Sequence, residues 1–199
     1  MTRVFIAALT LACAVGAAAQ TAAPNQRLRG TIEKIDSGAM VLKERNGETL
    51  SLVLADTLSV SEALPIDPAR IQSGTFVGTA SVAGADGNLS ALEVLVFPEA
   101  MRGTGEGHSG WDLQPGSMMT NATVASVATG AKGRTMTLRY KDGEKTIVVP
   151  DGVPIVTLQP ADRTLLVPGA KVIVTAQNRD GKLTAVRITA GRDGFTPPM

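Results

Sequence analysis

Asp86-Gly87-Asn88-Leu89-Ser90-Ala91 returns 94 residues later as Asp180-Gly181-Lys182-Leu183-Thr184-Ala185. Other matched positions precede these two hexapeptides in the same order, at separations of 92 to 96 residues. These pairs are Thr31 and Thr123, Asn46 and Asp142, Asp56 and Asp151, Pro65 and Pro160, and Gly74 and Gly169. Because the separation changes so little over a whole segment, the sequence predicts one module written twice, at residues 28–97 and 119–190.

Each copy has the pattern of short strands separated by turns. In the first copy, the leucines of residues 50–54 recur at every second position, which is typical of a strand with one buried face. Asn46-Gly47 favours a tight hairpin, because both residues tolerate positive φ, and Asp67-Pro68 resembles the start of a helical turn. Three strands, a short helical connection and two more strands give the order of an OB-type barrel. We therefore expect an all-β fold of two tandem small five-stranded OB-like barrels.

The pattern Gly30-Thr31-Ile32-Glu33-Lys34-Ile35, then Asn46-Gly47, Gly74 and the Asp86 hexapeptide, resembles a bacterial domain-of-unknown-function family of exported, OB-like repeat proteins. Some members of that family carry labels of metal transport or permease components. The resemblance implies an exported pair of OB-like repeats, and it brings no catalytic or ligand residues to this chain. A permease needs several apolar spans, and no segment after the amino terminus approaches that length.

The amino terminus has the features of a secretory signal peptide at residues 1–19. Arg3 precedes a short apolar run over 4–16, and three alanines ending at Ala19 offer a cleavage site. Cys13, the only cysteine, leaves lipid attachment open as an alternative to cleavage after Ala19. Cleavage would leave a mature chain without disulfides, and we expect it to be periplasmic or secreted with no membrane span.

Composition argues against several classes of function. The chain has no long amphipathic helix for a βαβ nucleotide-binding fold, and its aromatic content of 3% is low for stacking single-stranded nucleic acid. The glycines at 103–107 lack the lysine and serine or threonine that end a phosphate-binding loop. No Gly-x-Ser-x-Gly nucleophile elbow is present. We therefore expect neither an enzyme nor a nucleic-acid partner.

Residues 98–118 separate the two copies and contain the only histidine, His108, and the only tryptophan, Trp111. We expect a glycine-rich linker in which Trp111 fills a gap between the barrels. The alternative is a copper site, because one imidazole with several thioethers suits copper. The ligands would be His108, Met101, Met118 and Met119.

These observations predict an exported, non-enzymatic binding or scaffolding protein of the bacterial cell envelope. Its partner would be an envelope protein or a small ligand, and it would need no cofactor. A periplasmic copper-handling accessory protein, with copper bound in the central segment, is the alternative. Residues 191–199 are expected to form a carboxy-terminal tail.

Overall fold

The computed structural model describes residues 24–84, 87–130 and 133–198. Over these residues the protein is all-β, as the sequence predicts. The expected signal peptide at 1–19, with Cys13 and Ala19, lies outside the described residues. The strands of the first half are β1 (Gln26–Ile35), β2 (Ala39–Glu44), β3 (Thr49–Pro65), β4 (Phe76–Ala83), β5 (Leu89–Val96) and β6 (Gly107–Gly110). Those of the second half are β7 (Met118–Gly130), β8 (Gly133–Tyr140), β9 (Gly143–Val149), β10 (Ile155–Ala161), β11 (Lys171–Arg179) and β12 (Lys182–Ala190).

Three single-turn 3-10 helices connect these strands: η1 (Pro68–Arg70), η2 (Glu99–Met101) and η3 (Arg163–Leu165). The helical turn expected at Asp67-Pro68 is confirmed as η1. The Asp67 carboxylate accepts the backbone N–H of Ala69 at 2.7 Å and so caps the turn. Asp162 caps η3 at the corresponding place in the second copy.

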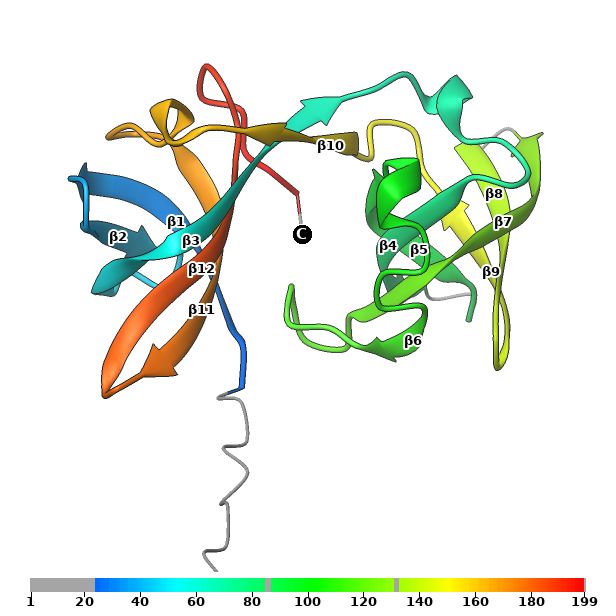
Figure 1. Ribbon diagram of the computed structural model, residues 1–199. Helices are drawn as coiled ribbons and strands as arrows, with labels where there is room; N and C mark the ends of the chain where they lie inside the picture. Colours follow the sequence, from blue (N-terminus) through cyan, green and yellow to red (C-terminus); the bar gives the residue numbers. More distant parts are fainter. Residues whose placement is uncertain (1–23, 85–86, 131–132, 199) are drawn as a thin grey trace, which may run out of the picture.

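The strands form two closed rings, which lie side by side in Figure 1. Ring 1 consists of β1, β2, the first part of β3, β12 and β11, and it closes through the antiparallel pair of β11 with β1. Ring 2 consists of β7, β8, β9, β5 and β4, and it closes through the antiparallel pair of β4 with β7. Each ring has one parallel seam, β3 with β12 in ring 1 and β9 with β5 in ring 2.

Each ring takes three strands from one copy of the repeat and two from the other. The expectation that 28–97 and 119–190 form separate barrels is therefore wrong. Ring 2 is built from the continuous segment 76–149, and it interrupts ring 1, whose strands come from both ends of the chain. The chain changes rings in both copies: after β3 it continues into β4 of ring 2, after β10 it continues into β11 of ring 1, and the two crossing segments pair with each other. The 17 residues of β3 span about 55 Å at about 3.3 Å per residue. That distance carries the chain out of ring 1 before β4 begins.

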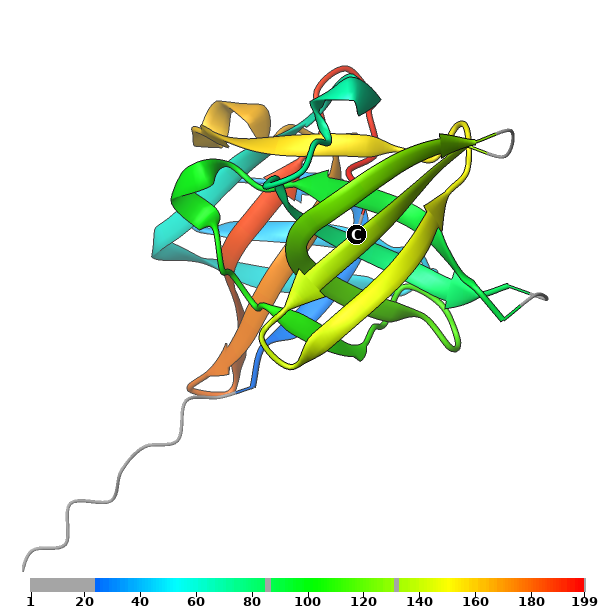
Figure 2. The ribbon, with the colours of Figure 1, turned by 90° about the vertical axis from the view of Figure 1, so that its right-hand side faces the viewer.

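Two strands cross between the rings at the upper edge in Figures 1 and 2. The last residues of β3 pair antiparallel with β10, and β10 also pairs in parallel with β5. Ala63 pairs with Leu158, its own counterpart in the repeat, so an approximate twofold axis passes through this pair. The structure thus keeps the symmetry of the duplication while exchanging strands between the two copies.

The rings have separate hydrophobic cores. Leu28, Met40 and Ile188 lie in the ring 1 core, and Met136 and Ile147 lie in the ring 2 core, all almost fully buried. Gly30 allows β1 to pair with strands on both its sides, because a Cβ at this position would lie 2.2 Å from the backbone oxygen of Lys43. Ring 1 closure therefore depends on a glycine at residue 30.

Candidate binding site

The sequence predicted that the central segment 98–118 is a linker between the barrels. The structure contradicts this prediction. The segment joins β5 to β7, and both strands belong to ring 2. Within it, β6 pairs antiparallel with β7 over Gly107–Gly110. A turn at 111–117 follows, closed by the Trp111 N–H donating to the Ser117 carbonyl at 2.8 Å. The segment thus begins and ends at strands of ring 2 and adds β6 to the edge of β7.

His108 packs against ring 2. Its register partner on β7 is Thr120, and its Nδ1 lies 2.8 Å from the Thr120 hydroxyl. Its ring is nearly parallel to that of Tyr140, with centroids 6.5 Å apart. Burial, followed by the nearby positive charge of Lys145, lowers the pKa of His108 below its usual value. His108 therefore favours the neutral form and serves as a packing residue.

The four candidate copper ligands do not converge. Met119 pairs with Ser109, and it is therefore on the opposite face of the sheet from His108, which pairs with Thr120. Met119 is also buried, with 4% of its surface exposed. Met118 shares the face of His108, and Met101 belongs to η2. Within the described ranges, no three His, Cys, Asp or Glu side chains gather as a possible metal site.

Trp111 contacts the other ring, in agreement with the expectation that it fills a gap between the barrels. The guanidinium of Arg27, on β1, lies 3.8 Å from the centre of its indole. Asp112 binds Arg29 at 2.8 Å and Arg27 at 3.0 Å. Burial raises the pKa of Asp112, but the two arginines outweigh it and the net pKa is lowered. Trp111 and Asp112 of this turn therefore connect ring 2 to ring 1 through contacts with arginines of β1.

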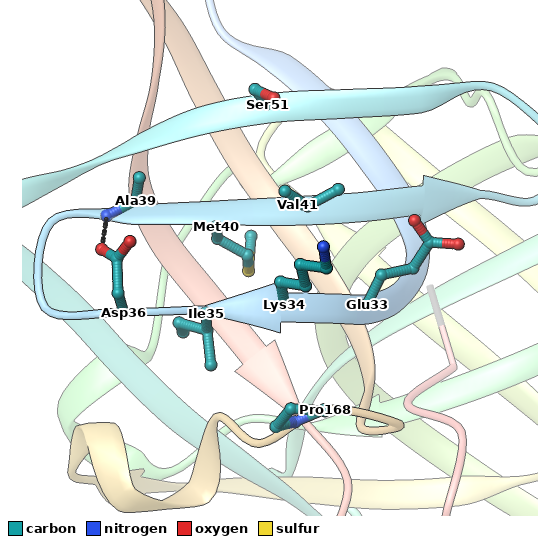
Figure 3. Close-up of a pocket in the computed structure, with 9 residues that line it drawn as sticks. All are labelled: Glu33, Lys34, Ile35, Asp36, Ala39, Met40, Val41, Ser51 and Pro168. Carbon is teal, nitrogen blue, oxygen red and sulfur yellow. Dashed lines mark hydrogen bonds between the residues drawn. The ribbon is translucent and has the colours of Figure 1, made fainter.

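A pocket of about 490 Å³ opens at the β1–β2 hairpin of ring 1, and residues from both faces of the hairpin line it (Figure 3). Its apolar lining comes from Ile35, Ala39, Met40, Val41 and Pro168, with Met40 at the buried end. Its polar lining is Glu33, Lys34, Asp36 and Ser51.

Asp36 stabilises the hairpin beside this pocket. Its carboxylate accepts the backbone N–H groups of Gly38 at 2.8 Å and Ala39 at 2.7 Å. These bonds, that of Gly38 first, hold the pKa of Asp36 below its usual value. Of the three charged residues that line the pocket, Glu33 and Lys34 are the two that are not bound to the backbone of the hairpin in this way. They carry one charge of each sign.

Exposed apolar side chains extend the pocket over the surface of ring 1. Val53 is 38% exposed and pairs with Ala39, and Val167 is 51% exposed and precedes Pro168. They are the two large hydrophobic residues most exposed in the described part of the chain. We call the set the apolar patch: Ala39, Val41, Val53, Val167 and Pro168.

The duplication supplies an internal comparison for this patch. Met40 pairs with Leu52 in ring 1 as Met136 pairs with Ile147 in ring 2, which fixes the correspondence of the two outer faces. Four positions that are apolar in ring 1 are polar in ring 2: Ala39 matches Thr135, Val41 matches Thr137, Val167 matches Gln72 and Pro168 matches Ser73. The patch is therefore specific to ring 1 and is not a property of the repeat.

Sequence reasoning placed the candidate site in the central segment and missed this surface. The signal was present in the alignment of the two copies, which shows where one copy is apolar and the other polar. It could not be used without knowing that Val167-Pro168 lies beside the β1–β2 hairpin, because these residues are far apart in the chain.

Comparisons with known proteins add no assignment. No family of known proteins, no curated protein and no solved structure matches this chain. Over the described residues, no helix has both the length and the apolar character needed to cross a bilayer.

Proposed function

We propose that this chain is an exported, non-enzymatic binding protein of the bacterial cell envelope, built from two OB-like barrels that exchange their fourth and fifth strands. Its ligand is a small molecule or a short peptide segment with an apolar face, held at the apolar patch of ring 1. The order of strands in each ring, with three antiparallel strands and one parallel seam, supports the OB-like description. Export is supported by the apolar run after Arg3 and the alanines ending at Ala19.

The observation that carries the proposal is the contrast between the two outer faces. A binding pocket is typically concave and mostly apolar, with a few polar groups that orient the ligand. The ring 1 pocket fits this description, with Met40 and Pro168 in its lining and Glu33 and Lys34 at its rim. Ring 2 has no such surface at the matching positions, where it carries polar residues such as Thr135.

The test uses a mixture of apolar tripeptides and an amide-resolved NMR spectrum of residues 24–199. We expect shift changes confined to the β1–β2 hairpin and the segment around Pro168, and we expect the peptides to be recovered unchanged by mass spectrometry. The double variant Val41→Thr, Val167→Gln, which gives ring 1 the residues of ring 2, should lose these changes. Val148→Thr, at the ring 2 counterpart of Val53, is the matched control and should keep them.

Shift changes centred on ring 2, or binding that survives the double variant, would contradict the placement of the site. Cleaved or modified peptides would contradict the non-enzymatic assignment.

A further inference from the structure

A second pocket, on the same outer face of ring 1, has a cationic lining. Thr31 on β1 pairs with Lys43 on β2 and with Lys171 on β11, so the three side chains form a row across neighbouring strands. Together with Arg45 they line a pocket of about 310 Å³. Thr196 and Pro197 of the carboxy-terminal tail form another of its walls. We call this the cationic pocket.

Its positive charges have no carboxylate partner among the described residues. Lys171 donates from Nζ to the Thr31 hydroxyl at 2.8 Å, and none of Lys43, Arg45 and Lys171 forms an ion pair in the described ranges. Glu44 is the one carboxylate in the lining, so three cations face one anion. An anionic group entering the pocket would meet a net positive charge on walls that exclude part of the surrounding water.

Ring 2 pairs the cation that matches Lys43 with one of its own carboxylates. Thr123, the counterpart of Thr31, pairs with Arg139 and with Phe76. Arg139 is at the position of Lys43, and Phe76 is at the position of Lys171. Arg139 binds Glu144 at 3.0 Å. The carboxylate of Glu106 accepts the backbone N–H of Lys141, the counterpart of Arg45, at 3.1 Å.

Ring 1 lacks this ion pair, because Lys43 pairs with Thr49 where Arg139 pairs with Glu144. Glu48, one residue before Thr49, accepts a hydrogen bond from the Asn46 side chain at 3.0 Å. Thr196 and Pro197 line the pocket from the tail that follows β12, as the segment that carries Glu106 follows β5 in ring 2. The two rings thus differ in whether the chain itself supplies the anion.

We propose that the cationic pocket binds a carboxylate supplied by a small external ligand. Carboxylate is favoured over phosphate because ring 2 places a carboxylate against the residue that matches Lys43. Arg45 offers a planar fork that matches a carboxylate. A volume of 310 Å³ equals about ten waters at about 30 Å³ each, which is room for a short dicarboxylate. This site is separate from the apolar patch and does not depend on its function.

The experiment titrates the full mature chain with succinate, and separately with inorganic phosphate, at low ionic strength with amide NMR detection. We expect succinate to shift residues of β1, β2, β11 and the tail, and its affinity to fall at least tenfold in the double variant Lys43→Gln, Arg45→Gln. Arg139→Gln, at the ring 2 counterpart of Lys43, is the matched control and should leave the affinity unchanged. Added salt should weaken binding, since the pocket is open to solvent.

A second variant, Thr196→Glu, keeps all three cations and places a carboxylate on the tail, in imitation of ring 2. It should reduce succinate affinity as strongly as removal of the cations. Binding of phosphate without succinate would overturn the carboxylate assignment. Absence of succinate binding, or binding unchanged in both ring 1 variants, would overturn the site.

Discussion

Residues 66–157 contain every strand of ring 2, and we expect this fragment to fold by itself as a monomer. It keeps β10 residues 155–157 and their pairing with β5, and it keeps the bond from the Ile66 N–H to the Ile155 carbonyl. A globular segment of roughly 90 residues has an unfolding free energy of about 5–14 kcal/mol. Excision removes the two ion pairs of Asp112, each about 0–1 kcal/mol. The contact of Arg27 with Trp111 adds about 0.5–2 kcal/mol. The total loss of about 0.5–4 kcal/mol leaves the fragment folded.

The assay compares this fragment with residues 24–97, the first copy of the repeat, by NMR dispersion, urea unfolding and gel filtration. Residues 24–97 contain strands of both rings and complete neither of them. We expect that fragment to be unfolded or associated, whereas 66–157 gives dispersed amides and one cooperative urea transition. A cooperative, monomeric 24–97 together with an unfolded 66–157 would refute the exchange of strands.

Cleavage of the full chain provides an independent measurement of the same exchange. A protease site inserted at Pro115-Gly116 divides the chain in the turn that follows β6. The two pieces should stay together in gel filtration and separate only in denaturant, because β4 pairs with β7 and β1 pairs with β11 across the cut. Pieces that separate in buffer would contradict this topology.

Three further outcomes are expected. The pKa of His108 is lowered in the folded protein, so as pH falls the unfolded chain binds a proton at this residue before the folded chain does. The free energy of unfolding, measured by urea titration, should therefore fall as pH drops from 7 to 5. The variant His108→Gln should reduce this pH dependence. Asp112→Asn should cost less than about 2 kcal/mol at pH 7, because it removes two ion pairs of about 0–1 kcal/mol each and the Asp112 carboxylate is 48% exposed. The pKa of Asp112 is lowered in the folded protein, so the ion pairs stabilise the protein at pH values above the pKa of Asp112 in the unfolded chain. This stabilisation disappears as pH falls through the pKa of Asp112 in the folded protein. An equal loss of stability in Asp112→Asn at pH 7 and at pH 2 would contradict a role of these ion pairs. Gly30→Ala should destabilise ring 1 by about 1–3 kcal/mol or more through contact with the Lys43 oxygen. Hydrogen exchange should then rise in ring 1 and not in ring 2, while Gly38→Ala, whose nearest neighbour is 4.0 Å away, should have little effect.

Local patterns in the sequence predicted the strands well. The leucines of 50–54 lie in β3 as expected, and Gly47 has the positive φ of 93° that its hairpin requires. Asp67 caps a helical turn, as its position before Pro68 indicates. These features are decided by neighbouring residues, so an amino-acid pattern over a few positions is enough to find them.

The pairing of the strands could not be predicted in the same way. The two copies have the same alternation and the same turns, so β4 and β5 meet the local requirements of either ring equally well. The choice between the rings is accompanied by the pairing of β3 with β10 at the crossing, which joins residues far apart in the chain and leaves no local pattern in the sequence. Both the apolar patch and the cationic pocket depend on this choice, since Pro168 and Lys171 reach β1 and β2 only through the exchange.

The insertion of ring 2 into ring 1 also determines the order in which the chain can fold as it is synthesised. β1, β2 and β3 emerge first, but the strands that close their ring begin at Lys171, about a hundred residues after β3 ends. At about 5–20 residues per second, ring 2 is complete while the first three strands still wait roughly 5–20 s for their partners. During that interval the edges of β1 and β3 are unpaired, which makes them open to pairing with other nascent chains. A chaperone that shields residues 26–60 would therefore increase the yield of this protein more than one that acts on its second half.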